Sequence, residues 1–192
     1  VGNIENTIFL RTNYKAPNWR LVKFNHDNPG PENWIEVIPE SEYPLNSVSI
    51  TGGKLLVKYS KDVSSCLYVY SLDGKMETEV ELPTVGTASG FGGKQNDNEV
   101  FYNFTSFAYP PTIFRYNINA NSTTLYRQSK VDVDFSLYET KQVCYPSKDG
   151  TKSPMFITHK KGLQYDGTAP TLLYAYGGFN ISINPYFSVS RM

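Results

Sequence analysis

A glycine pair follows an apolar, aromatic run near the end of the chain, in residues 172–180 (LLYAYGGFN). The phenol of Tyr176 is followed by two residues that lack a Cβ atom, Gly177 and Gly178, and then by the aromatic ring of Phe179. Glycines at the end of a strand let a ligand approach the backbone closely. In α/β-hydrolases, a turn of this kind after the third strand helps to form the oxyanion hole. The motif therefore predicts a loop that stabilises negative charge during acyl transfer.

The residues that would attack a substrate are not found in the sequence. There is no Gly-x-Ser-x-Gly elbow, because the serine of residues 86–90 (GTASG) stands one position too late. In this fold the triad runs Ser, Asp, His, downstream of the oxyanion loop. The two histidines, His26 and His159, precede the loop, and both are interpreted as surface residues. We therefore expect the nucleophile, the acid and the base to lie beyond Met192.

Other kinds of site find little support in the sequence. No His/Cys/Asp cluster has the spacing of metal ligands. Residues 90–94 (GFGGK) are rich in glycine but lack Walker spacing, so they favour a turn between strands. Cys66 and Cys144 lie in strand-like runs, where two buried thiols in a cytosolic protein are favoured over a disulfide. We expect no metal and no cofactor.

Composition excludes several classes of partner. The 192 residues include 18 Lys plus Arg and 18 Asp plus Glu, so the net charge is near zero and no basic patch indicates a nucleic acid. No apolar run approaches the roughly 18–20 residues that span a bilayer, so we expect no membrane partner. A hydrophobic fraction of 40% is ample for a packed core. The first residues resemble neither a signal peptide nor an initiator start.

Short β-branched and aromatic runs recur with a period of about 46 residues, which is typical of propeller blades. A weaker run at 47–50 precedes the second set, and turn residues at 28–31, 72–75 and 119–121 recur between the second and third runs. The three series are residues 8–10, 55–57 and 100–102; 21–24, 67–70 and 113–116; and 34–38, 79–82 and 123–127.

This periodicity favours a β-propeller over an ordinary antiparallel sandwich with regular strand spacing. A four-stranded blade cannot bury both of its faces alone, so neighbouring blades must cover it. About three blades fit into the first two-thirds of the chain, and three blades do not close a ring. We therefore expect an open arc with exposed edges.

The repeat ends after Val131, and a different order of elements follows. Residues 139–145 and 154–159 predict two strands of a hairpin around an Asp-Gly turn. A polar loop then leads to a strand over residues 170–176 and the glycine pair. An α/β-hydrolase begins in this order, so we place propeller blades in residues 1–131 and the start of a hydrolase domain in residues 132–192.

Four strings in this setting resemble the prolyl oligopeptidase family of serine peptidases. They are residues 101–107 (FYNFTSF), 145–152 (YPSKDGTK), 159–162 (HKKG) and 176–183 (YGGFNISI). The resemblance runs along essentially the whole chain. It implies a mainly β chain that holds the C-terminal blades of a seven-bladed β-propeller, followed by the first strands of an α/β-hydrolase peptidase domain.

The resemblance also implies an activity. Members of the family are cytoplasmic peptidases that cleave short peptides after proline through an acyl-enzyme, using a Ser-Asp-His triad. On the matching motif, Tyr176 would donate its hydroxyl to the oxyanion and Phe179 would line the proline pocket. The expected partners are short proline-containing peptides and the remainder of the peptidase domain. Without the triad, the 192-residue chain is expected to be inactive alone.

Two other functions remain open at this point. Some members of the family transfer the acyl group to a peptide amine and so make cyclic peptides, and no residue here separates cyclisation from hydrolysis. The chain could instead be a non-catalytic propeller that binds peptides or proteins. A Gly-x-Ser-x-Gly motif in the sequence after Met192 would exclude that binding module.

Overall fold

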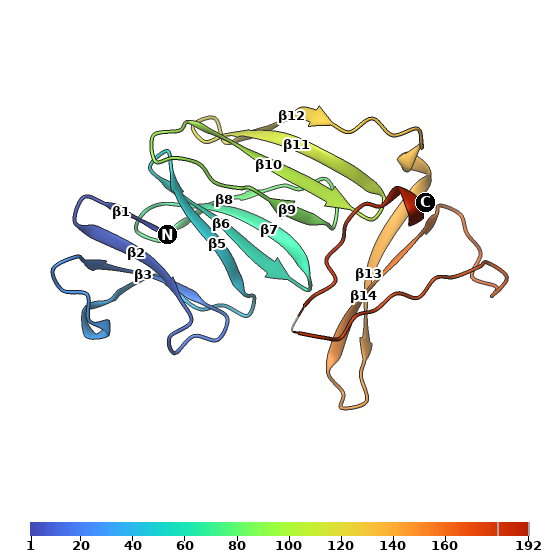
Figure 1. The fold of residues 1–192 in the computed structure, drawn as a ribbon, viewed down its shortest axis with the longest axis horizontal. Helices are drawn as coiled ribbons and strands as arrows, with labels where there is room; N and C mark the ends of the chain where they lie inside the picture. The colour runs from blue at the N-terminus through green and yellow to red at the C-terminus, as the bar shows by residue number, and fades with distance from the viewer. Residues whose placement is uncertain (180, 192) are drawn as a thin grey trace.

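The structure is a computed structural model that describes residues 1–179 and 181–191. The described residues form three four-stranded antiparallel sheets and one two-stranded hairpin, as Figure 1 shows. The first sheet contains β1 (Gly2–Ile4), β2 (Thr7–Thr12), β3 (Arg20–Asn25) and β4 (Ile35–Ile38). The second contains β5 (Leu45–Thr51), β6 (Lys54–Lys61), β7 (Ser64–Tyr70) and β8 (Met76–Val80). The third contains β9 (Thr87–Ser89), β10 (Glu99–Ser106), β11 (Tyr109–Asn117) and β12 (Ser122–Gln128).

Each four-stranded sheet is a meander, in which every strand pairs with the next along the chain. The three predicted series are confirmed as the second, third and fourth strands of the three sheets. The weaker run at 47–50 is confirmed within β5, the first strand of the second sheet. The first strands of the other two sheets, β1 and β9, were not predicted, because three residues are too few to show alternation.

The sheets pack face to face because their strands are apolar on both sides. In β6, Leu55, Val57 and Tyr59 pack toward the first sheet, whereas Leu56 packs toward the third. Successive side chains of a strand point to opposite faces, so a run of apolar residues serves two neighbours at once. The second sheet is therefore buried on both faces.

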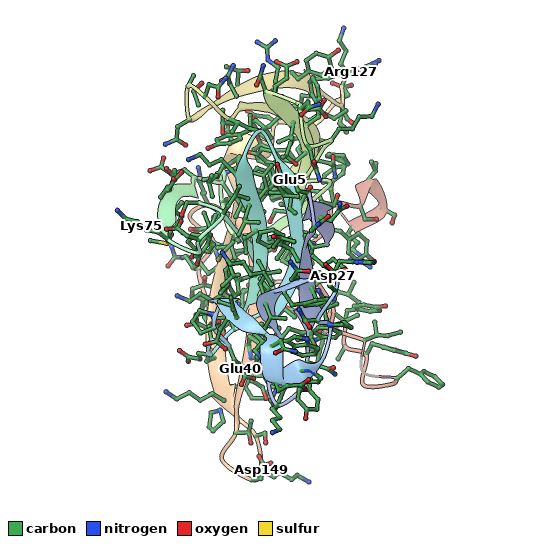
Figure 2. The ribbon with its side chains drawn as sticks, turned by 90° about the vertical axis from the view of Figure 1, so that its left-hand side faces the viewer. Glu5, Asp27, Glu40, Lys75, Arg127 and Asp149 are labelled. Atoms are coloured by element: carbon green, nitrogen blue, oxygen red, sulfur yellow. The ribbon has the colours of Figure 1, made fainter. Side chains whose placement is uncertain are left out.

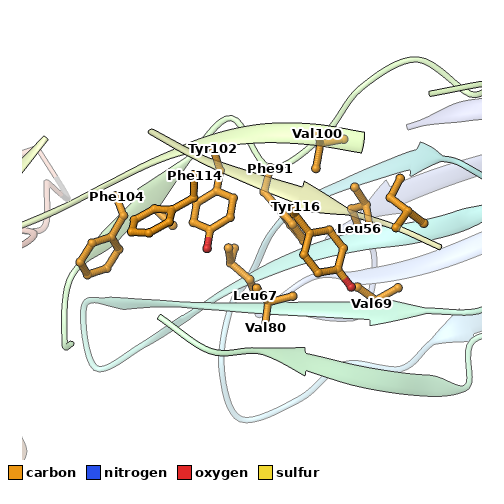
Figure 3. Close-up of a cluster of buried hydrophobic side chains, with 12 residues drawn as sticks. Leu56, Leu67, Val69, Val80, Phe91, Val100, Tyr102, Phe104, Phe114 and Tyr116 are labelled. Carbon is orange, nitrogen blue, oxygen red and sulfur yellow. The ribbon is translucent and has the colours of Figure 1, made fainter. Parts of the chain in front are cut away.

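The contact between the second and third sheets is an aromatic cluster. Figure 3 shows Leu67 and Val69 of β7 facing the rings of Tyr102, Phe114 and Tyr116. The Tyr102 and Phe114 rings are stacked with their centroids 5.4 Å apart. Aromatic pairs of this kind add specific geometry to the burial of apolar area. The cluster thus fixes how the third sheet lies on the second.

The far side of the third sheet is uncovered among the described residues. Phe101 of β10 is 41% exposed, and Leu125 and Tyr126 of β12 are 60% and 61% exposed. The three sheets form an arc, and the described part of the chain contains no closed ring. The expected open arc is confirmed.

A hairpin of β13 (Tyr138–Pro146) and β14 (Lys152–Lys160) follows a short 3-10 turn, η2 (Phe135–Leu137). Both predicted strands and their turn are confirmed, and Figure 2 shows Asp149 at the far tip of this hairpin. Hydrogen bonds from the hydroxyl of Ser147 and the backbone of Thr151 lower the pKa of Asp149 to about 2. The hairpin rests on the propeller, since Gln142 Nε2 donates to the Asp62 carbonyl at 2.5 Å.

The predicted strand over residues 170–176 is wrong for this structure. No described strand pairs with these residues, and Leu172 and Leu173 are 79% and 82% exposed. A strand of a parallel sheet is stabilised by backbone hydrogen bonds to neighbours, which no described residue supplies here. The described residues show a mainly β fold and no α/β-hydrolase sheet.

The prediction of two buried thiols is also wrong for one of them. Cys144 is exposed near the end of β13, because that part of the hairpin extends away from the sheets. Cys66 is partly buried on β7, and burial raises the pKa of its thiol. Both cysteines are free, so no disulfide joins them.

One turn of the second sheet packs against the first sheet and gives a test of the packing. Gly74 lies in the turn between β7 and β8 with φ +89°, and a Cβ there would stand 1.8 Å from the Val37 carbonyl oxygen of β4. Gly53 has a similar φ of +71° with nothing within 4 Å. Both glycines adopt the left-handed conformation that side chains disfavour.

We expect Gly74→Ala to lower the free energy of unfolding by about 2–4 kcal/mol, because left-handed strain adds to overpacking between two sheets. Gly53→Ala, the matched control, should cost only the strain, about 1 kcal/mol. Denaturant titration of both variants would measure the difference. Equal losses would show that the Gly74 turn does not pack against β4.

Candidate functional site

The chain that carries the predicted oxyanion motif is an extended tail after β14. It loops away from the hairpin and then returns toward the third sheet, as the red part of Figure 1 shows. A turn precedes the motif at Asp166, where hydrogen bonds from the Thr168 hydroxyl and N–H hold the pKa of the carboxyl below its usual value. The motif itself forms no strand.

The structure brings Tyr176 and Gly178 together. A Cβ built on Gly178 would stand 3.0 Å from the Tyr176 hydroxyl oxygen and 3.2 Å from Cζ, so the phenol ring lies against the glycine backbone. Nothing lies within 4 Å of the equivalent position on Gly177. The Tyr176 side chain is about half exposed, and no described residue forms a hydrogen bond with its hydroxyl. A phenol hydroxyl can donate one hydrogen bond, and no described residue accepts one from Tyr176.

Phe179 is not brought into a pocket. It is 92% exposed and has a φ of +54°, in the left-handed region. No described side chain covers its ring, so the proline pocket expected from the motif is not formed by the described residues alone. Asn180, which ends the motif, lies outside the described residues.

His159 is not the solvated surface residue that the sequence suggested. Its side chain is only 7% exposed, because Tyr165 folds back over it with 2.7 Å between the hydroxyl and Nε2. Nδ1 lies 2.8 Å from the Lys160 carbonyl, which requires a proton on that nitrogen. Glu139 Oε1 approaches Nε2 to 3.6 Å on the same side as the Tyr165 hydroxyl. His26, by contrast, is exposed beside Asp27, as predicted.

Sequence reasoning missed the residues that hold the tail on the propeller. Thr87 Oγ1 donates to the Pro185 carbonyl at 2.7 Å, and Thr105 Oγ1 accepts from the Phe187 N–H at 3.2 Å. No sequence signal could have found them, because each pair joins residues that are 82 or 98 positions apart. The contact exists only when the tail returns to the third sheet.

A separate small cavity of about 290 Å³ opens between the second and third sheets. It is lined by Tyr116, by Asn121, which donates to Thr78 at 2.8 Å, and by the ion pair of Lys54 and Glu77 at 2.7 Å. Burial raises the pKa of Tyr116 to about 12, so its hydroxyl stays protonated. Tyr116 also donates to Asn121 at 2.5 Å, so the polar groups of these five side chains are paired with one another.

Neither a metal centre nor a membrane span is found in residues 1–179 and 181–191. No group of three His, Cys, Asp or Glu side chains is placed to hold an ion. No helix there is long and apolar enough to cross a bilayer.

Successive four-stranded meanders that cover one another's faces define the chain as a β-propeller protein. Residues 1–129 match the family model described as the prolyl oligopeptidase N-terminal β-propeller domain. The chain belongs to the prolyl oligopeptidase family.

Curated relatives agree with this assignment along nearly the whole chain. A prolyl endopeptidase of Elizabethkingia miricola is 46% identical over 183 residues, which are 95% of this chain and 26% of that protein. Prolyl oligopeptidase A of Galerina marginata is 34% identical over 195 residues, 99% of this chain and 26% of that protein. A dual function macrocyclase-peptidase of the same fungus is 33% identical over 193 residues, 98% and 26% respectively. The chain thus spans about a quarter of the length of these relatives.

Solved structures share the fold. One, from a structural and mechanistic analysis of two prolyl endopeptidases, has a TM-score of 0.90 and 39% identity, and covers 98% of this chain and 28% of that chain. Prolyl oligopeptidase B from Galerina marginata, bound to a 25mer macrocyclization substrate, has a TM-score of 0.86 and 33% identity. That match covers 97% of this chain and 26% of the other.

The contact between Tyr176 and Gly178 can be tested without an activity assay. We expect Gly178→Ala to move the Tyr176 ring by a few tenths of an ångström, because the new methyl group meets the phenol. Gly177→Ala, where the space is open, should leave the ring in place. NMR shifts of the Tyr176 ring protons would report the movement, and stability should change by less than about 0.5 kcal/mol in both variants. Equal shifts in the two variants would contradict this geometry.

Proposed function

We propose that the complete protein is a serine peptidase of the prolyl oligopeptidase type, which cleaves short peptides after proline through an acyl-enzyme. This chain would supply an oxyanion donor and part of the proline pocket, while the triad would come from the rest of the peptidase domain. The observation that carries the proposal is the half-exposed Tyr176 beside Gly178, whose hydroxyl has no hydrogen-bond partner among the described residues, in a chain 46% identical to a prolyl endopeptidase.

The chemistry assigned to Tyr176 follows from the charge that develops in acyl transfer. When the serine attacks, the carbonyl oxygen of the scissile bond becomes negatively charged, and a phenol O–H that points at it forms a stronger hydrogen bond than it does with the neutral substrate. The absence of a Cβ at Gly178 lets the ring lie close to the backbone. Tyr176 would thus stabilise the transition state without gaining or losing a proton.

Phe179 is assigned to the pocket for the proline side chain. An aromatic ring offers a flat apolar surface to the pyrrolidine, and at 92% exposure Phe179 is available to a partner surface. The remainder of the peptidase domain would form the other walls. We accordingly place blades in residues 1–131 and the start of the peptidase domain in residues 132–192, and we propose that the isolated chain has no peptidase activity.

We expect Tyr176→Phe in the complete protein to lower kcat by about 10²–10³, since one oxyanion donor is lost. KM and the thermal midpoint should change little, because the half-exposed phenol ring is retained. Hydrolysis of a chromogenic Gly-Pro substrate would measure kcat and KM, and a thermal melt would measure the midpoint. Tyr145→Phe, at a similarly exposed tyrosine of β13, is the matched control. An unchanged kcat would remove Tyr176 from the mechanism.

Peptide cyclisation is a second candidate function. It is favoured by the 33% identity to a dual function macrocyclase-peptidase and by the structural match to a homologue bound to a macrocyclization substrate. An acyl-enzyme can be released by water or by a peptide amine, and Tyr176 would serve both reactions. Mass spectrometry of the products from a long proline-containing peptide would separate them, because the cyclic product lacks the mass of one water relative to the linear one.

A further inference from the structure

We propose that Thr87 and Thr105, on the third propeller sheet, are positioning residues for the hydroxyl of Tyr176. They would act through the backbone of residues 185–187 and the side chain of Arg191. The proposal rests on the function proposed above, and it makes the propeller a support of the oxyanion site.

The first step is a pair of hydroxyls on one sheet. Thr87 of β9 and Thr105 of β10 are direct neighbours in the antiparallel register. Thr87 donates to the Pro185 carbonyl at 2.7 Å, and Thr105 accepts from the Phe187 N–H at 3.2 Å. The two hydrogen bonds therefore hold the backbone on both sides of a single residue, which fixes the direction of the tail at that point.

These two hydrogen bonds, here called the anchor, are shielded from water by apolar contacts. Pro185 is buried, and the Phe187 ring packs edge-on against Phe135 of η2 with centroids 5.1 Å apart. Thr105 also donates to the Tyr109 carbonyl at 3.1 Å, so its hydroxyl is held as an acceptor for the tail. Hydrogen bonds in such a partly buried setting are stronger than exposed ones. The anchor is thus built by the third sheet and by the segment that follows it.

The second step links the anchor to the segment that contains Tyr176. The residue held between the two hydrogen bonds is Tyr186, and Arg191 of η3 (Val189–Arg191) donates to its hydroxyl. The Arg191 guanidinium lies over two rings, 4.5 Å from the centroid of Tyr186 and 5.1 Å from that of Tyr174. A planar cation between two aromatic faces is attracted to both. Tyr174 stands two positions before Tyr176.

Contacts therefore run from the propeller to Tyr174, and the backbone of two residues joins Tyr174 to the proposed oxyanion donor. Neither threonine touches the site, so both would act only by setting where the Tyr176 hydroxyl lies. A displacement of about 1 Å at a reacting group can lower a rate about 10²-fold. Loss of the anchor should consequently reduce kcat more than it affects substrate binding.

The test uses the complete protein with Thr87→Val and Thr105→Val, which keep the shape of the side chain and remove the hydroxyl. We expect each to lower kcat about tenfold, with KM within about twofold of its starting value. Thr87→Ser and Thr105→Ser restore the hydroxyl and should recover most of kcat. Thr124→Val, on the exposed edge strand of the same sheet, is the control and should change neither constant.

The decisive measurement is a double-mutant cycle with Tyr176→Phe. If Thr105 acts through the Tyr176 hydroxyl, Thr105→Val should lower kcat in the parent and cause no further loss in the Tyr176→Phe background. Arg191→Lys keeps the charge, loses the planar group and does not touch the sheet. It should show the same dependence on Tyr176, even if a threonine variant folds poorly.

The outcomes separate the two proposals. Equal losses of kcat in both backgrounds would overturn the positioning role and leave the proposed function intact. An unchanged kcat in Tyr176→Phe alone would remove Tyr176 from the mechanism, and the positioning role with it, whereas a complete protein that does not hydrolyse the Gly-Pro substrate would overturn the proposed function itself. Hydrogen exchange of residues 181–191 gives a readout independent of catalysis. Faster exchange in the valine variants but not in Thr124→Val is expected, and unchanged exchange would show that no anchor exists.

Discussion

Burial of both faces of the second sheet is the constraint on which the rest of the structure depends. Leu55 and Leu56 are neighbours in sequence and point to opposite sides, yet neither is exposed to solvent. A sheet of this kind cannot be stable alone, since one apolar face would always meet water. The first and third sheets are therefore required by the second, and the arc of blades follows from a local alternation repeated along the chain.

This stacking places the turns of successive sheets side by side. The turn between β6 and β7 holds Asp62 and Val63 at positive φ, which is costly for a β-branched residue, and the hairpin contacts it through Gln142. The third sheet contributes Thr87 and Thr105, which form hydrogen bonds with the tail. A rigid propeller can thus support a loop that forms few contacts of its own.

The proposed oxyanion loop lies in a tail that is held by distant parts of the chain. Tyr176 and Phe179 are exposed, and their own segment forms no regular structure. The Tyr176 phenol lies against Gly178, and Arg191 lies over the rings of Tyr174 and Tyr186. A donor for an oxyanion must be held in place before the reaction, because reorganisation during the reaction would cost rate.

The sequence by itself determined the repeated strands, their turns and the hairpin, because alternation and turn chemistry act over a few residues. The family came from the resemblance of four sequence strings, such as residues 176–183. Only the tertiary structure decided that Cys144 faces solvent, that Tyr165 covers His159, and that residues 170–176 form no strand. It also brought Thr105 to the tail. The contacts of Thr105 and His159 depend on residues that only folding brings near. A strand over residues 170–176 would need a neighbouring strand, which the described residues do not supply. No local sequence pattern specifies such contacts.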